Sequence, residues 1–303
     1  MKKNFLRSRW LFTMLLFVTT MIMPSMMWAK SISPTRPNGE GTAENPYLIG
    51  TAAELYWFAG LVNGTLVDVE KDASANAKLM NDITVNTGVL DANKDLVSGK
   101  NFIPWTPIGT SDDDAYTGTF DGKGYTISGL YFDHPDADYY VGLFGCIGAD
   151  GKISNVGVLD SYFQFGAQGG GVCGVNHGEL QNCSNSSTII GNKYKGKGGV
   201  CGDNGDINIK GTVRNCKNTG SVRGSAPLGG VCGNNYGTIK NCFNEGPVSV
   251  TVKSGGVGGV CGVNRVYGTI ESCYNTGSVS GQYSVSVGGV CGYDSLYNKL
   301  LLS

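Results

Sequence analysis

The sequence is short of net charge, proline and histidine, and each shortage excludes a class of protein. The formal net charge is −1 over 303 residues, so no basic surface for nucleic acid is expected. Proline numbers only 9 and glycine does not recur at every third position, which excludes a collagen triple helix. The two histidines, His134 and His177, lie far apart in the sequence, which excludes the His-Glu-x-x-His site of zinc peptidases. We predict that both are turn or loop residues rather than metal ligands.

Other catalytic and cofactor patterns are missing as well. No Gly-x-Ser-x-Gly elbow precedes a helix, and no Cys-x-x-Cys pair offers a metal site. Residues 191–197 resemble a phosphate-binding loop, but Gly198 follows instead of serine or threonine, and no helix comes after it. We interpret Lys193, Lys195 and Lys197 as a solvated loop. The sequence therefore predicts a protein without a cofactor and favours a non-catalytic one.

Residues 1–29 have the form of a signal peptide. Four basic residues precede an apolar run over 10–28, and Ala29 suits the position before a cleavage site. An uncleaved membrane anchor is the alternative, but Pro24 interrupts the run. No later apolar stretch approaches about 18 residues, so we expect no membrane span in the mature chain. We predict an exported protein, secreted or held at the cell surface.

Glycine is abundant, with 48 residues, and 41% of the sequence is hydrophobic. That hydrophobic content is too high for a disordered chain, so the glycines serve tight turns or close backbone contacts. Residues 30–50 suit a linker and the start of a cap. A capping box at Thr51–Glu54 and an end at Asn63-Gly64 predict a capping helix over 51–64. Residues 65–140 hold short apolar runs between turn residues, which predicts irregular β-helix coils.

A repeat of about 30 residues fills 141–303 and is the strongest pattern in the sequence. The segment Gly-Gly-Val-Cys-Gly occurs five times at intervals of 28 to 31 residues, and a second element ending in cysteine follows four of the copies. The cysteines therefore form two columns: Cys173, Cys201, Cys232, Cys261 and Cys291 in the first element, and Cys183, Cys216, Cys242 and Cys273 in the second. Cys146 lies outside both columns.

This repeat predicts an all-β fold, a right-handed parallel β-helix (solenoid) with an N-terminal capping helix. The period is too short for a propeller blade, and each repeat offers about three short strands. Stacked parallel coils place like residues above one another about 4.8 Å apart, and such crossovers are right-handed. Asn185, Asn218, Asn244 and Asn275 would then form a ladder of side-chain amides. The cysteines of both columns would be structural and buried, mostly as free thiols, although the spacing also permits disulfides between neighbours.

The pattern Gly-Gly-Val-Cys-Gly, then Asn, then Gly-x-Ile-x-Asn-Cys, then Gly-x-Val resembles the GLUG repeat of bacterial exported proteins of the IgA-protease type, which is frequent in Bacteroidota. Residues 41–49 with the following helix resemble the N-terminal cap of such chains. Residues 120–127 resemble their early coils and those of pectate-lyase-like β-helices. The resemblance covers roughly 39–292 and implies the β-helix fold. It also implies a location outside a bacterial cell, secreted or at the cell surface or outer membrane. Family members that cleave proteins carry a separate zinc peptidase domain, which has no counterpart here.

The predicted function is a non-catalytic scaffold for adhesion or ligand binding. We expect a glycan or a host or matrix protein as partner, with Trp105, Tyr116, Tyr139 and Tyr140 as candidate sugar-stacking residues. Two alternatives stay open: a polysaccharide-degrading β-helix enzyme (lyase or glycoside hydrolase), and a fragment of a longer surface protein whose repeats are truncated at Ser303.

Acidic runs bear on the enzyme alternative. Asp112, Asp113 and Asp114 are interpreted as a solvated loop, with calcium binding or sugar contact as the alternative. Asp112, Asp121 or Asp133 beside a basic residue in one groove would favour the enzyme, because β-helix enzymes that cut polysaccharides use carboxylates gathered on one face.

Overall fold

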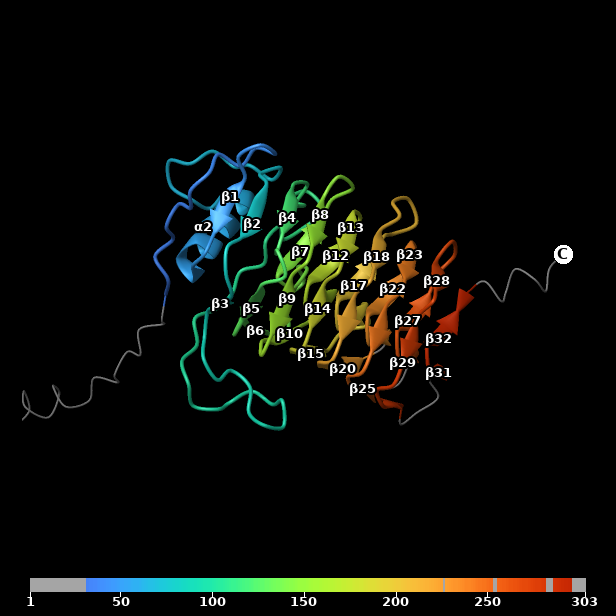
Figure 1. Ribbon diagram of the computed structural model, residues 1–303. Helices are drawn as coiled ribbons and strands as arrows, with labels where there is room; N and C mark the ends of the chain where they lie inside the picture. The colour runs from blue at the N-terminus through green and yellow to red at the C-terminus, as the bar shows by residue number, and fades with distance from the viewer. Residues whose placement is uncertain (1–30, 226, 253–254, 282–285, 296–303) are drawn as a thin grey trace, which may run out of the picture. The chain divides into compact units, whose positions relative to one another are not determined.

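The computed structural model describes residues 31–225, 227–252, 255–281 and 286–295 (Figure 1). The predicted signal peptide at 1–29 and the predicted truncation of the repeats at Ser303 lie outside these residues. Within the described ranges, no helix has both the length and the apolar character needed to cross a membrane.

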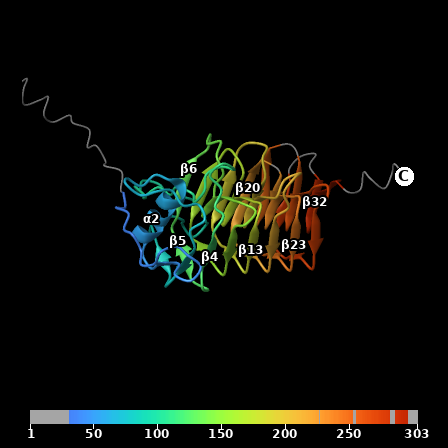
Figure 2. The same ribbon diagram turned by 90° about the horizontal axis from the view of Figure 1, so that it is seen from above.

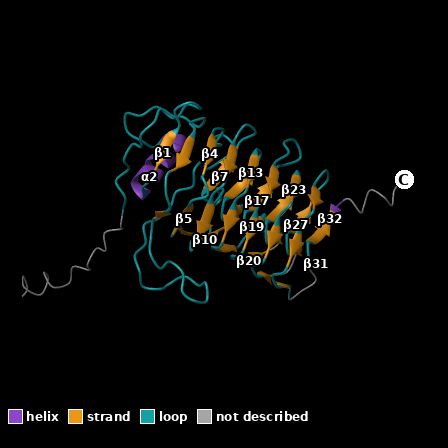
Figure 3. Cartoon of the chain, in the orientation of Figure 1, coloured by secondary structure: helices purple, strands orange, loops and turns teal. Residues whose placement is uncertain are grey.

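The described chain is a parallel β-solenoid of about eight coils, as the repeat predicts (Figure 3). Each regular coil contributes one strand to each of five sheets, rather than the three strands expected. The difference arises because two of the five strands are only about two residues long, too short to stand out as apolar runs.

The strands are grouped here by sheet, in the order in which they stack. Sheet 1 contains β1 (Tyr47–Ile49), β2 (Ala77–Leu79), β4 (Thr119–Asp121), β8 (Lys152–Ser154), β13 (Glu179–Gln181), β18 (Thr212–Arg214), β23 (Thr238–Lys240) and β28 (Thr269–Glu271). Sheet 2 contains β3 (Ile83–Thr84), β5 (Thr126–Ser128), β9 (Gly157–Leu159), β14 (Ser184–Asn185), β19 (Lys217–Asn218), β24 (Phe243–Asn244) and β29 (Tyr274–Asn275). Sheet 3 contains β6 (Tyr131–His134), β10 (Tyr162–Phe165), β15 (Thr188–Gly191), β20 (Ser221–Ser225), β25 (Val248–Val252) and β30 (Val279–Ser280). Sheet 4 contains β11 (Gly169–Gly170), β16 (Lys197–Gly198), β21 (Leu228–Gly229), β26 (Gly256–Gly258) and β31 (Ser286–Gly288). Sheet 5 contains β7 (Phe144–Ile147), β12 (Cys173–Asn176), β17 (Cys201–Asn204), β22 (Cys232–Asn235), β27 (Cys261–Asn264) and β32 (Cys291–Asp294).

Like residues stack on like residues along the solenoid. In sheet 5, the cysteines of successive coils are direct register partners, from Cys173 with Cys201 to Cys261 with Cys291, and the strands run parallel. The valine before each cysteine stacks as well, since the amide of Val231 donates to the carbonyl of Val260 at 2.9 Å, and Val260 to Val290 at 2.9 Å. The predicted like-on-like stacking is therefore confirmed.

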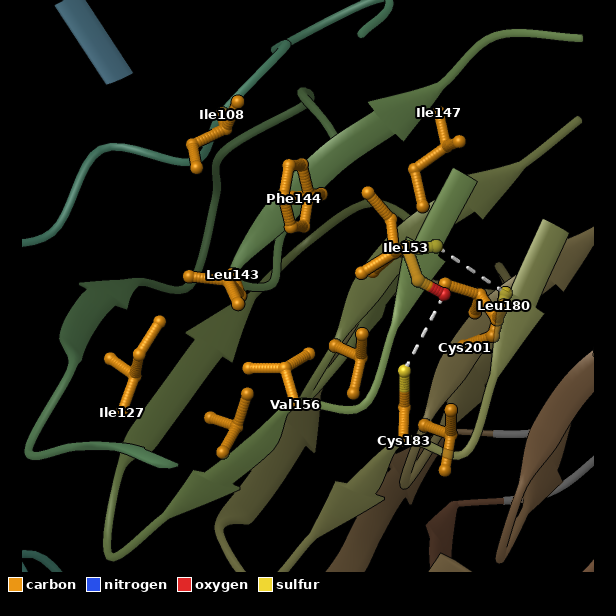
Figure 4. Packing of buried hydrophobic residues seen from close by; sticks show 14 of the residues in the cluster. Ile108, Ile127, Leu143, Phe144, Ile147, Ile153, Val156, Leu180, Cys183 and Cys201 are labelled. Carbon is orange, nitrogen blue, oxygen red and sulfur yellow. Dashed lines mark hydrogen bonds between the residues drawn. The ribbon is translucent and has the colours of Figure 1, made fainter. Parts of the chain in front are cut away.

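The interior is a continuous apolar core that runs the length of the coils. Ile153, Leu180 and Val156 point into it from successive strands and turns, and Cys183 and Cys201 lie among them (Figure 4). The predicted amide ladder is confirmed: Asn185 donates to Asn218, Asn218 to Asn244, and Asn244 to Asn275, at 2.8, 2.8 and 2.7 Å. Each bond satisfies a buried polar group that would otherwise be costly.

The corner between sheets 1 and 2 is made by asparagine rather than glycine. Asn155, Asn182, Asn215 and Asn241 all have φ between 52° and 55°, in the left-handed region that asparagine tolerates. Glycine serves close backbone contact instead. A Cβ added to Gly198 would lie 2.1 Å from the carbonyl oxygen of Cys201, so a side chain there cannot fit.

The helix α2 (Ala52–Asn63) lies at one end of the stack (Figure 2). Its capping box forms as predicted: the Glu54 amide donates to Thr51 Oγ1 at 3.2 Å, and the Thr51 amide donates to Glu54 Oε2 at 2.9 Å. Phe58 contacts the rings of Tyr116 and Phe120, each at 6.0 Å between centroids, so the helix covers the open end of the core.

The coils before residue 141 are irregular because long loops interrupt them. At the end of the segment expected to hold a linker and the start of the cap, β1 pairs with β2. The loop between β3 and β4 packs along sheet 3, where the hydroxyl of Thr188 donates to the carbonyl of Lys94 at 2.6 Å and Val89 contacts Tyr162. Further along the same loop, residues 104–118 run beside β7 and shape the site described below.

Candidate functional site

Two of the four predicted sugar-stacking residues are core residues. Trp105 and Tyr116 are 2% and 0% exposed. The Trp105 indole nitrogen donates to the carbonyl of Gly142 at 3.0 Å, and the Tyr116 hydroxyl donates to the carbonyl of Ala75 at 2.8 Å. The prediction is wrong for these two residues, because the loop that carries them folds under α2 and covers both rings.

The other two aromatic residues lie nearer the surface. Tyr139 is 40% exposed and packs edge-on against Phe132, with ring centroids 5.6 Å apart. Tyr139 lines a small hollow of about 300 Å³ together with His134, the last residue of β6. Tyr140 instead donates its hydroxyl to Asp112 Oδ2 at 2.8 Å, so its polar end is engaged.

The three carboxylates considered as an alternative calcium site do not converge. Asp114 forms an ion pair with Lys71, and that hydrogen bond holds the pKa of the Asp114 carboxyl below its usual range. Asp112 turns the other way, toward Tyr140, while Asp113 is exposed. A calcium ion needs six to eight oxygen ligands around one point, and this loop does not present them.

The cysteine columns face the core. Every cysteine of the chain lies in the described ranges and is free, with eight of the ten buried. The sulfur atoms of Cys173 and Cys201 lie 3.6 Å apart, which is contact and not a bond. Burial raises the pKa of the Cys201, Cys232 and Cys261 thiols well above the ordinary value, so these groups are neutral and inert.

One lysine of the expected solvated loop is buried. Lys197 is 0% exposed and occupies the register position that Leu228 holds in the next coil. Its ammonium donates to the carbonyl and the hydroxyl of Ser225 at 2.9 and 3.0 Å. Burial lowers the pKa of Lys197 to about 7. The loop interpretation is therefore wrong for Lys197, while Lys193 and Lys195 do lie at the surface.

A groove of about 330 Å³ lies on the outside of sheet 1, over β2 and β4. Its charged lining consists of Glu44, Lys78, Asp121 and Lys123, two of each sign. Asp121 accepts from the Asn155 side chain and from the Lys123 amide, each at 2.9 Å, and pairs with the Lys123 ammonium at 2.9 Å. Partial burial alone would raise the pKa of Asp121, but these hydrogen bonds more than offset it, so the pKa lies below its usual range.

From this groove, the outer face of sheet 1 continues along the solenoid. One outward position per strand, here named the outer column, is occupied by polar residues that differ from coil to coil: Lys78, Asp121, Ser154, Gln181, Arg214, Lys240 and Glu271. The inward position beside it is always apolar, from Ala77 to Ile270. The core is thus repeated while the surface varies.

A second cluster joins residues that the sequence analysis treated separately. Asp112, Cys146 and His177 each bring one potential ligand atom within 4.8 Å of the others. Cys146 Sγ lies 3.5 Å from Asp112 Oδ1, and His177 Nε2 lies 3.3 Å from Asp206 Oδ2. The three residues come from a loop, a strand and a turn in successive coils, so no sequence spacing reveals them.

The sequence did hold a signal for one surface feature that we did not predict. Phe243 and Tyr274 follow the cysteine of the second element, at the outward position of a period-two pattern. Their rings stack with centroids 5.0 Å apart and planes 1° apart, and Tyr274 is 51% exposed. Reading the outward residues of the repeat coil by coil would have found this pair.

Comparisons with known proteins support the fold more than a function. No protein-family model matches the chain. The chain is 34% identical over 159 residues to halomucin of Haloquadratum walsbyi, which is 52% of this chain and 2% of halomucin. It is 35% identical over 149 residues to a candidate glycine-rich membrane protein of Evansella cellulosilytica, which is 48% of this chain and 15% of that protein. The chain therefore spans a small part of the length of both relatives.

Among solved structures, the chain is similar to a candidate immunoglobulin A1 protease from Bacteroides ovatus. The TM-score is 0.56 at 19% identity, and the match covers 88% of each chain. At this level of identity the likeness shows a shared β-solenoid fold and nothing about activity.

Proposed function

We propose that this chain is a non-catalytic ligand-binding scaffold in an exported, surface-exposed protein, and that it binds an extended, hydroxyl-rich polymer such as a glycan. The observation that carries the proposal is the outer face of sheet 1. The outer column spans six strand spacings from Lys78 to Glu271, or roughly 29 Å, on a rigid backbone. A face of that length matches a linear ligand of several units.

The groove at the start of this face favours a neutral ligand. Lys78 and Lys123 are balanced by Glu44 and Asp121, so the lining offers hydrogen-bond donors and acceptors without net charge. Sugar hydroxyls both donate and accept, and therefore suit such a lining. Binding that depends on hydrogen bonds rather than net charge will change little with salt concentration.

The wider setting also supports a surface protein. One curated relative is named as a membrane protein, and both relatives are far longer than this chain. The resemblance to GLUG repeats of bacterial exported proteins agrees with this setting, and the alternative that the chain is part of a longer surface protein belongs to the same proposal.

The test is a binding array of neutral glycans, acidic glycans and matrix proteins, probed with the chain from residue 31 onward. For a ligand found this way, Lys78→Gln is expected to weaken binding at least tenfold. Lys217→Gln, on the outer side of sheet 2, is the matched control and is expected to leave binding unchanged. Equal loss in both variants, or binding to acidic ligands alone with a steep salt dependence, would contradict the proposed face.

A polysaccharide-degrading activity is the second candidate, because Asp121 lies in one groove beside Lys78 and Lys123. The low pKa of Asp121 argues against a general acid, which must hold a proton near neutral pH. Release of reducing ends or unsaturated sugars from the bound glycan, abolished by Asp121→Asn, would replace the scaffold proposal with this one.

A further inference from the structure

Cys146 is the cysteine that belongs to neither column. Its register partner in the next coil is Val175, and the coils after that place Asp203, Asn234 and Val263 at the same position. The fold therefore does not require a thiol here.

The neighbouring loop opens directly over this residue. The Cys146 amide donates to the carbonyl of Gly109 at 2.6 Å, and its carbonyl accepts from the Tyr116 amide at 3.0 Å. Residues 110–115 leave the sheet between these two anchor points. Asp112 lies in this excursion and brings Oδ1 to 3.5 Å from the Cys146 sulfur.

His177 completes the group from the other side. It lies in the turn after β12, where its amide donates to the carbonyl of Ile147 at 2.8 Å, one residue beyond Cys146. Its side chain is 9% exposed, and a ligand atom of His177 lies within 4.8 Å of those of Asp112 and Cys146. A carboxylate, a thiol and an imidazole thus meet at one partly covered point.

Further contacts hold the side chains of His177 and Asp112 in place. Asp206 Oδ2 lies 3.3 Å from His177 Nε2, while Asp206 Oδ1 accepts from the amides of Asn208 and Ile209 at 2.6 and 2.8 Å. Tyr140 fixes the far oxygen of Asp112. Carboxylate-to-histidine contacts of this kind orient the ligands of protein zinc sites.

We propose that Asp112, Cys146 and His177 bind a zinc ion, with a fourth position open to water. Zinc takes thiolate, imidazole and carboxylate ligands at about 2.0–2.3 Å, so tetrahedral geometry sets the ligand atoms roughly 3.3–3.6 Å apart. The Cys146–Asp112 separation already has this value, and the histidine must approach by no more than about 1.5 Å. Calcium and magnesium prefer oxygen ligands alone and do not suit this set.

The charges at the site agree with a divalent cation. A zinc ion displaces the proton of the Cys146 thiol and neutralises the thiolate and the Asp112 carboxylate together. The bound ion would tie the loop 110–115 to sheet 5.

The experiment measures zinc binding by the chain from residue 31 onward, prepared metal-free under reducing conditions. Calorimetry and metal analysis are expected to give one zinc ion per chain, and Co²⁺ in its place is expected to show a thiolate-to-cobalt charge-transfer band. Cys146→Val, the residue of the neighbouring coil, is expected to abolish the band and lower zinc affinity at least a hundredfold. His177→Gln is expected to weaken zinc binding, and Asp206→Asn to do so about 10–100-fold.

Two exposed positions supply controls that leave the site intact. Asp113→Asn, beside Asp112 on the same loop, and His134→Gln, the other histidine, are expected to bind zinc as the unaltered chain does. A charge-transfer band that persists in Cys146→Val would overturn the proposal, since another cysteine would then be the ligand. Equal zinc uptake by the unaltered chain and by Asp112→Asn would overturn it as well. Asp112→Asn changes only a surface loop, so this comparison does not require the fold to tolerate a substitution in the core.

Discussion

The buried amide ladder offers a sharp test of how the coils are held together. Asn218 is 0% exposed and makes four hydrogen bonds. It accepts from Asn185 at 2.8 Å and from the Gly220 amide at 3.1 Å, and it donates to Asn244 at 2.8 Å and to the Gly220 carbonyl at 2.9 Å. Substitution by alanine removes all four hydrogen bonds and leaves their former partners buried, away from bulk water.

The cost follows from the groups left without partners. In Asn218→Ala, two N–H donors, on Asn185 and Gly220, lose their acceptor, and an unsatisfied buried donor costs about 1–3 kcal/mol. We therefore expect the free energy of unfolding to fall by about 4 kcal/mol. Asn218→Asp keeps the volume but places acceptor against acceptor at Asn244, so its comparable loss separates hydrogen bonding from cavity formation.

The outer corner provides the matched control. Asn215 belongs to an exposed ladder, donating to Asn182 at 3.1 Å, and its φ of 53° suits glycine. Asn215→Gly is expected to change stability by less than about 0.5 kcal/mol, because water replaces the lost bonds. Urea unfolding followed by circular dichroism measures all three variants. A loss below about 1 kcal/mol in Asn218→Ala, or equal losses in Asn218→Ala and Asn215→Gly, would refute the reasoning.

Three further predictions concern single side chains. The pKa of the Lys197 ammonium is about 7 in the folded protein, against an ordinary value of 10.5, so between these pH values the unfolded chain binds one proton more than the folded chain. The free energy of unfolding should therefore rise as the pH increases from about 7 to 10.5. Lys197→Met should remove that rise, as denaturation measured at several pH values would show. Cys232 donates to the carbonyl of Asn234 at 3.0 Å, so Cys232→Ser keeps a partner and should cost only about 1 kcal/mol in thermal unfolding, while rapid alkylation of native Cys232 would contradict its burial. Gly198→Ala should cost about 3 kcal/mol because its Cβ meets backbone, whereas Gly289→Ala, with nothing within 4 Å, should be near neutral in the same assay.

The regular half of the fold could be predicted because each coil has the same types of residue at the same positions of the repeat. The cysteine columns and the Asn185 ladder follow from a fixed spacing, since parallel strands place equal positions in contact. A second ladder, from Asn176 through Asn204 and Asn235 to Asn264, obeys the same rule, with each bond at 2.8 Å. Its asparagines end the first element of each repeat, so the same reading applied there would have predicted it.

The candidate sites could not be predicted in this way because they depend on loops without a period. Trp105 and Tyr116 are of the residue types that often stack on sugars. Only the path of the 104–118 loop under α2 shows that they are core residues. Lys197 looked like a loop residue because its sequence neighbours are lysine and glycine, yet its register position is that of Leu228. Asp112, Cys146 and His177 meet only because one loop leaves the sheet beside Cys146.

The fold and both proposed sites depend most on the parallel, in-register stacking of the coils. The most direct test places spin-labelled residues on the outer column at Lys78 and Glu271, and in a second protein at Lys78 and Arg214, and measures each distance by pulsed electron resonance. Six and four strand spacings predict separations of about 29 and 19 Å, which differ by two spacings. Equal separations in the two proteins, or a broad distribution in both, would contradict the stacked solenoid and every site built upon it.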